Sequence, residues 1–87
     1  MRSRRSRAPS EPIQDADRPL FEVLRAWRRE QASAQAVPPY VIFPDRTLMD
    51  IARLRPETAD MLALCSGVGQ AKLARYGEAV IRLVRDH

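Results

Sequence analysis

Apolar side chains recur every three or four residues early in the chain, at the spacing of one face of an α-helix. This stripe consists of Leu20, Phe21, Leu24 and Trp27. The charged residues within the segment, including Arg28, lie mostly off the stripe. Pro19 suits a first helical turn, because the N–H that proline lacks would have no partner there. The pattern predicts a helix that begins near Asp17 and ends near Ala34.

The next segment, residues 37–44, is apolar and contains three prolines. They exclude a regular helix here, because proline lacks a backbone N–H and fixes its own φ. Since the sequence offers no second strand for pairing, we expect an extended apolar connection packed over the core. Asp45 is then expected to cap a helix that Pro56 ends. The inner face of that helix should carry Leu48, Ile51 and Ala52.

Two further helical stretches are expected in the C-terminal third. Thr58 is a good N-cap for a short helix from Ala59 to about Leu64. Residues 67–69, Gly-Val-Gly, break the chain sharply. The apolar stripe of the final stretch consists of Leu73, Tyr76, Val80, Leu83 and Val84. Gly77 within it marks either a close contact with another helix or a break into two helices.

These elements predict an all-α fold, a compact orthogonal bundle of four to five short helices over residues 17–87, with no sheet. Residues 1–16 contain too few apolar side chains to offset the entropy lost on ordering. We expect them to be a flexible basic tail or a linker from a larger protein. Their four arginines either touch nucleic acid nonspecifically or have no role.

The chain of 87 residues has a formal net charge of +4, and 14 of its 15 cationic residues are arginine. Arginine binds phosphate in a planar, bidentate manner and stacks on bases, so a polyanionic partner is one explanation. A genome that favours arginine codons is the other. Residues 19–87 carry ten cationic and eight acidic side chains, a net charge of only +2. Any binding to nucleic acid should therefore be weak.

Several function classes lack the residues they need. Cys65 is the only cysteine and His87 the only histidine, which argues against a disulfide framework, a classical zinc site and histidine-based catalysis. No phosphate-binding loop motif and no acid–base pair is recognisable, so we expect no catalytic residues, no metal and no cofactor. No apolar run reaches the roughly 18 residues of a membrane span, and no membrane partner is expected. Cys65 should be buried as a small hydrophobic residue.

Two local features could bind nucleic acid. Gly67 and Gly69 precede a helix whose first backbone N–H groups could hold a phosphate, with Lys72 adding a charge; alternatively, the glycines serve only a left-handed turn. Tyr40 follows two prolines and could stack on an unpaired base; alternatively, it covers the core with its hydroxyl in water. Trp27 shares the apolar stripe of the first helix and is interpreted as a core residue.

Several motifs also occur in one order along residues 20–85. They are LFxxLRxWR at 20–28, PPYVIFxDxTLxxIA at 38–52, Arg55-Pro56, and LxxCxGVGxxKLxRYG at 62–77. This ordered string resembles the HRDC domain, a family found in helicases and at the C-terminus of RNase D. The residues of the second and last motifs are more similar to those of the bacterial RecQ branch than to those of the RNase D branch. The departures are Cys65 for a usual Val or Ile, Gln31 for an aliphatic residue and Met61 for a capping acid.

The resemblance implies an accessory domain of about five helices beside a separate motor or nuclease, and not an enzyme by itself. It implies weak contact of Tyr40 with single-stranded or forked DNA. The supporting positions would be Arg46, Gly67, Gly69, Lys72 and Arg75. The alternatives are a protein-interaction module that docks on the helicase core in cis or on a repair partner, and the HRDC domain of an RNase D-type nuclease. We expect a monomer in the bacterial cytoplasm, associated with the nucleoid.

Overall fold

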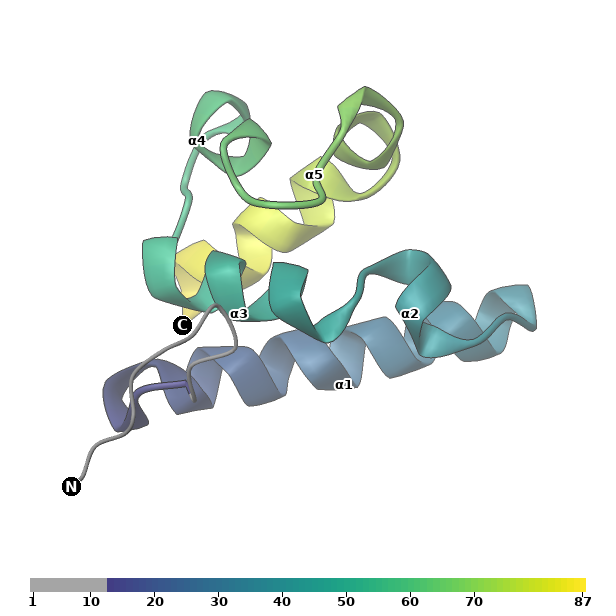
Figure 1. Cartoon of the computed structure of the whole chain (residues 1–87), viewed down its shortest axis with the longest axis horizontal. Helices are drawn as coiled ribbons and strands as arrows, with labels where there is room; N and C mark the ends of the chain where they lie inside the picture. Colours follow the sequence, from purple (N-terminus) through teal and green to yellow (C-terminus); the bar gives the residue numbers. More distant parts are fainter. Residues whose placement is uncertain (1–12) are drawn as a thin grey trace, which may run out of the picture.

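The computed structural model of the protein describes residues 13–87, and these form helices and loops without a strand (Figure 1). In chain order the elements are the 3-10 turn η1 (Asp15–Asp17) and the helices α1 (Arg18–Gln35), α2 (Pro39–Ile42), α3 (Asp45–Leu54), α4 (Ala59–Ala63) and α5 (Gln70–Asp86). The predicted all-α architecture is confirmed. Helix α1 has 18 residues, close to the length predicted, and α5 has 17.

Helix α1 is the base of the bundle, and η1, α2, α3 and α5 all pack on it, whereas α4 packs on α5 (Figure 1). The core lies between these helices. Its fully buried side chains include Leu20, Leu24, Ile42, Phe43, Leu48, Ile51, Leu62 and Val80. The stripes predicted from spacing therefore face inward on α1, α3 and α5. Trp27, Leu73 and Leu83 pack against this core but are only partly buried.

The start of α1 is close to the prediction, with Asp17 at the N-cap position and Pro19 in the first turn. Ile13, within the predicted tail, is buried in the core cluster, and η1 follows it. Residues 1–12 lie outside the described residues. At its other end α1 reaches Gln35, where Ala36 adopts the left-handed conformation with φ 56°.

The prediction that three prolines exclude a helix between residues 37 and 44 is wrong. Pro39 to Ile42 form the single helical turn α2. Pro38 is extended and serves as the N-cap, and Pro39 occupies the first turn, where a missing N–H costs no hydrogen bond. The Val41 N–H donates to the Pro38 carbonyl at 3.0 Å. The segment does pack over the core as expected, through Ile42 and Phe43.

The expected capping by Asp45 is also wrong. Pro44 occupies the N-cap of α3, Asp45 is the first helical residue, and no side chain caps this end. The helix ends at Leu54, where Arg55 adopts the left-handed conformation with φ 49° just before Pro56. The other predicted cap is confirmed, since Thr58 Oγ1 accepts the Met61 N–H at 3.2 Å at the start of α4.

Gly77 marks a close contact and not a break, because α5 is continuous through it. A Cβ at this position would lie 3.2 Å from Leu73 Cδ1 and 3.8 Å from Leu62 Cδ2. The short distance is to Leu73 of α5 itself, while 3.8 Å to Leu62 of α4 is an ordinary van der Waals distance. Gly77 is thus buried where α5 packs against α4.

Arg28 is buried in α1, with only 8% of its surface exposed. Its Nη1 donates to the Phe43 carbonyl at 2.8 Å, and its Nη2 pairs with Asp45 Oδ1 at 2.8 Å. One guanidinium therefore binds the carbonyl between α2 and α3 and the first carboxylate of α3. Among the described residues, its Nε has no hydrogen-bond partner.

We expect Arg28→Met to lower the free energy of unfolding by about 1–3 kcal/mol, because it leaves a buried carbonyl without a donor. The change should appear as a lower urea midpoint with an unchanged m-value. Arg29→Met is the matched control, since Arg29 is exposed on the same helix, and should shift stability by no more than about 0.5 kcal/mol. Equal stability of the two variants would contradict the role given to Arg28.

Cys65 is 3% exposed at the end of the α4 segment, which confirms the prediction that it is buried. Burial, aided by the nearby negative charge of Asp50, raises the pKa of its thiol from 9.0 to about 11. The native thiol is therefore protonated and shielded at neutral pH. Thiol reagents need the thiolate and access to it, so native Cys65 should be inert.

We expect the Cys65 thiol to react with an aromatic disulfide reagent far more slowly in the native protein than in urea. Above the unfolded pKa only the unfolded chain loses the thiol proton, so this group's contribution to stability should fall from about pH 9 to about pH 11. Urea titrations at both ends of this range, with Cys65→Ala as the control for other titrating groups, measure the effect. Equal reaction rates in the native and unfolded states would disprove the burial.

Candidate nucleic-acid interface

Tyr40 projects from the short helix α2 and is 69% exposed. Its neighbour Val41 is 42% exposed, while Ile42 and Phe43 are fully buried. The α2 segment is thus anchored from one side and presents Tyr40 on the other. A tyrosine in this position does not cover the core, which removes the alternative interpretation left open by the sequence.

Lys72 lies in the first turn of α5 and reaches across to α2. Its ammonium donates to the Val41 carbonyl. The nitrogen also lies 5.8 Å from the ring centroid of Phe43 and 5.7 Å from that of Tyr76, within the range of a cation–π contact. Lys72 therefore joins α5 to the α2 segment through the hydrogen bond to Val41 and the ring of Phe43, while Tyr76 belongs to its own helix.

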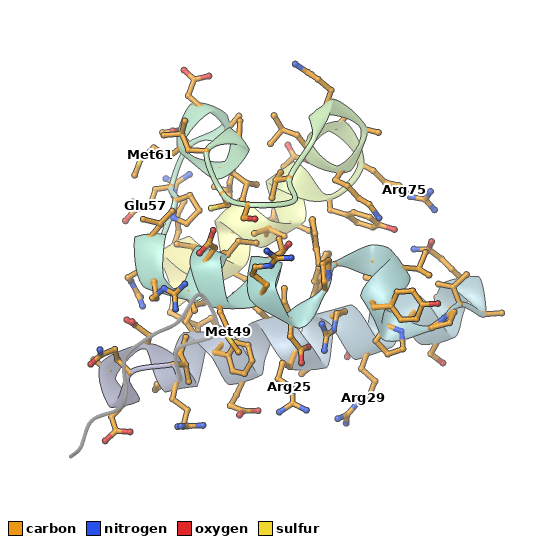
Figure 2. The ribbon with its side chains drawn as sticks, in the orientation of Figure 1. Arg25, Arg29, Met49, Glu57, Met61 and Arg75 are labelled. Atoms are coloured by element: carbon orange, nitrogen blue, oxygen red, sulfur yellow. The ribbon has the colours of Figure 1, made fainter. Side chains whose placement is uncertain are left out.

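Arg75 is the next basic residue on α5, and Figure 2 shows it projecting outward above the end of α1. Its Nη2 donates to Gln35 Oε1 at 3.0 Å. The Gln35 amide in turn donates to the Tyr76 hydroxyl at 2.9 Å. The guanidinium also lies 5.4 Å from the Tyr76 ring. Arg75 is exposed, so it can meet a ligand while its head group stays oriented by Gln35.

The two glycines of the turn before α5 differ in what they do. Gly67 has φ +83°, and a Cβ there would overlap Thr47 Oγ1 of α3. Left-handed geometry and close packing therefore account for Gly67. Gly69 is extended at the N-cap of α5, makes no side-chain cap, and has no atom within 4 Å of a Cβ position. The first N–H groups of α5 are accordingly left uncapped by any side chain.

Arg46 is exposed in the first turn of α3 and forms no ion pair within residues 13–87. Its neighbour Thr47 is the residue against which Gly67 packs. The structure thus places α2, the first turns of α3 and α5, and the glycine turn next to one another. Five of the six residues of the sequence-predicted site lie on these four adjoining segments, and Arg75 follows in the second turn of α5.

The arginines as a whole do not gather on one surface. Figure 2 shows Arg25 and Arg29 projecting from the outer side of α1, away from the other helices, whereas Arg75 projects from α5. Arg25 pairs with Glu22 at 3.5 Å and Arg53 with Asp50 at 3.0 Å. The opposite charges of such exposed or half-exposed pairs largely cancel, so the pairs add little to the electrostatic potential at the surface. Any basic face is therefore local.

Arg28 is the residue that sequence analysis misjudged. The apolar pattern sets Arg28 off the stripe with the other charged residues, although it stands four residues after Leu24 and four before Ala32, both buried. An arginine at a position of the apolar stripe is itself a signal, because arginine is almost never buried without a partner. That signal predicts a buried guanidinium with a polar partner, and the structure pairs Arg28 with the exposed carboxylate of Asp45.

Trp27 belongs to an aromatic cluster behind the site. Its ring lies 6.2 Å from Phe43 and 5.5 Å from Tyr76, edge to face in the second pair. The outer edge of Trp27 lines a shallow hollow of about 300 Å³ together with Glu78 and Arg82 of α5. A second hollow of about 420 Å³ continues along α5 to Asp86. The spacing of residues along the chain does not predict these hollows.

Within residues 13–87, no group of three or more His, Cys, Asp or Glu side chains is arranged to hold a metal ion. In the same part of the chain, no helix combines the length and the apolar character needed to cross a bilayer.

The sequence model of the HRDC domain matches residues 17–84. The chain belongs to the HRDC domain family. Its order of motifs and its helical bundle thus agree with the resemblance stated above.

Two kinds of helicase contain similar sequences. The chain is 44% identical over 71 residues to the ATP-dependent DNA helicase UvrD2 of Mycobacterium tuberculosis, covering 82% of the chain and 10% of that protein. It is 40% identical over 68 residues to the ATP-dependent DNA helicase RecQ of Bacillus subtilis, covering 78% of the chain and 12% of that protein. The chain therefore spans about a tenth of the length of these relatives.

Two solved domains of the RecQ helicase from Deinococcus radiodurans have similar structures. HRDC domain 3 gives a TM-score of 0.77 at 30% identity, covering 80% of this chain and 92% of that one. The solution structure of the HRDC1 domain gives 0.57 at 54% identity, covering 80% and 93%. The HRDC fold of the RecQ type is thereby shown for this chain.

The two glycines of the turn allow a matched test. Gly67→Ala should lower the free energy of unfolding by about 1–3 kcal/mol, because it combines a strained φ with an overlap on Thr47. Gly69→Ala should cost less than about 1 kcal/mol, since its backbone suits alanine and the space is open. Thermal or urea unfolding of the two variants measures the difference. Equal losses would show that the contact between Gly67 and α3 is not tight.

Proposed function

We propose that the chain is an auxiliary nucleic-acid-binding domain of a RecQ-type DNA helicase and binds single-stranded or forked DNA weakly. The observation that carries the proposal is Tyr40, an exposed aromatic side chain on a helical turn whose other side is anchored in the core. Stacking of a base on an aromatic ring contributes about 1–3 kcal/mol and does not depend on sequence. The domain would thus help the motor engage its substrate without choosing a sequence.

Phosphate contacts would come from the segments next to α2. Arg46 and Arg75 are exposed cations, in the first turn of α3 and the second turn of α5. The uncapped N–H groups after Gly69 add a partial positive charge. Because residues 19–87 have a net charge of only +2, we expect a dissociation constant on the order of micromolar or weaker.

The wider assignment rests on the relatives. UvrD2 and RecQ are both named ATP-dependent DNA helicases, and the chain matches only a tenth of either. We infer that the ATPase lies in the rest of the parent protein, and that this domain has no catalytic role of its own. We further infer that it acts as a monomer within a bacterial helicase at the nucleoid.

A protein-docking role is the second candidate, and one observation favours it. Three large apolar side chains on α3, α4 and the loop that follows are exposed, namely Leu54, Met61 and Leu64. Leu64 is 79% exposed, and Figure 2 shows Met61 at the outer side of α4. The partner would be the helicase core in cis or another repair factor. Absence of salt-sensitive DNA binding by the chain would favour this role.

The DNA-binding proposal predicts different behaviour for Tyr40 and Arg46. Tyr40→Ala should weaken binding to a single-stranded oligonucleotide about fivefold or more with the salt dependence unchanged, because no charge is lost. Arg46→Ala should weaken binding and reduce the slope of log K against log salt by about one. Fluorescence anisotropy at several salt concentrations measures both, with folding checked by circular dichroism. If both folded variants bind like the parent, this face is the wrong one.

A further inference from the structure

We propose that Lys72 is a positioning residue, which fixes the short helix α2 and with it Tyr40, and is not a ligand to a DNA phosphate. The inference rests on the proposed function, because it assigns the part that one residue of the same face plays in binding. It also makes a claim about α2 in the free protein, which can be tested without DNA.

Helix α2 cannot hold its own shape. It has four residues, and its backbone hydrogen bonds are Val41 N–H to Pro38 at 3.0 Å and Phe43 N–H to Pro39 at 3.4 Å. Isolated helices far longer than this are marginal in water. Its conformation must therefore come from contacts with other parts of the protein. The prolines restrict the backbone conformation at the N-terminal end of α2. Contacts with other helices must therefore fix its C-terminal end.

Two cations from other helices hold that end. Arg28 of α1 donates to the Phe43 carbonyl, and Lys72 of α5 donates to the Val41 carbonyl. The last carbonyls of a helix have no partner within it, and cations are favoured next to them. Lys72 is thus the residue of α5 that holds α2 in place by a hydrogen bond.

The contacts of the Lys72 ammonium lie within the domain. It lies over the rings of Phe43 and Tyr76 at 5.8 and 5.7 Å, and the side chain is half-buried. A phosphate would have to compete with these contacts. Arg46 differs in both respects, because it is exposed and lies over no aromatic ring of the described part of the chain.

Tyr40 depends on this fastening because little else holds it. It is largely exposed, and Val41 beside it is exposed as well. The direction of the ring is therefore set by the α2 backbone. A backbone fixed before binding removes an ordering cost when a base stacks. If α2 is loosened, the apparent affinity falls by the fraction of molecules that remain competent.

The experiment uses the whole chain with Lys72→Met, which keeps a long apolar stem but removes the charge and the donor. Lys72→Arg restores both. Arg82→Met is the matched control for net charge, since Arg82 lies on the same helix and lines the hollow beside Trp27. Each is measured alone, and Lys72→Met is also combined with Tyr40→Ala. The readouts are amide hydrogen exchange of the free protein and affinity for single-stranded DNA at several salt concentrations.

In the free protein, Lys72→Met should speed exchange of the Val41 and Phe43 amides by about tenfold while leaving α4 unchanged, and Lys72→Arg should restore protection. The affinity of Lys72→Met for DNA should fall about three- to tenfold, and its slope of log K against log salt should equal that of Arg82→Met. In the Tyr40→Ala background, Lys72→Met should weaken binding no more than Arg82→Met does.

Two results would overturn the proposal. One is unchanged exchange of the α2 amides in folded Lys72→Met. The other is a loss of affinity that adds fully to that of Tyr40→Ala, with a slope about one smaller than that of Arg82→Met, which would make Lys72 a phosphate ligand. If the parent binds no DNA, the proposed function fails, while the exchange measurements still decide whether Lys72 holds α2.

Discussion

The guanidinium of Arg28 occupies the point where three helices meet. The Arg28 side chain extends from α1 among apolar neighbours. Its guanidinium binds the carbonyl of Phe43, which follows α2, and the carboxylate of Asp45, the first residue of α3. Burying a guanidinium is costly unless it is paired and hydrogen-bonded, and here both conditions are met at two of its nitrogens. Because Asp45 faces water, only one partner of the ion pair loses its hydration. The entry into α3 is consequently set by a polar contact within the apolar packing.

An aromatic cluster extends this arrangement toward α5. Trp27 of α1, Phe43 of the connecting segment and Tyr76 of α5 lie within 6.2 Å of one another, centroid to centroid. Edge-to-face pairs of this kind add about 0.5–1.5 kcal/mol beyond area burial. Since Lys72 and Arg75 lie over the same Tyr76 ring, two of the three basic residues of the candidate face rest on the core itself. The face and the fold therefore share their supporting residues.

The sequence predicted what depends on local periodicity and missed what depends on tertiary contact. The stripes of α1, α3 and α5 and the cap at Thr58 follow from spacing and side-chain chemistry within a few residues. The helical turn α2 could not be predicted in this way, since it is too short to be stable alone. The roles of Arg28 and Asp45 were misassigned, because their partners lie in different helices. The same reason hid the contact between Lys72 and Val41. Of the six site positions, local chemistry indicated Tyr40, Gly67, Gly69 and Lys72, and the family resemblance added Arg46 and Arg75.

The way in which α4 packs on the rest of the domain affects which segment unfolds first. This helix has five residues and packs chiefly on α5, with Leu62 as its buried side chain, whereas α2, α3 and α5 all pack on α1. Proteins unfold locally in cooperative units, and those with the fewest buried contacts open first. The segment from α4 to the glycine turn is therefore expected to form a separate unit of lower stability than the α1 assembly. Its opening would expose the sulfur of Cys65 while the proline-led turn that bears Tyr40 stays in place.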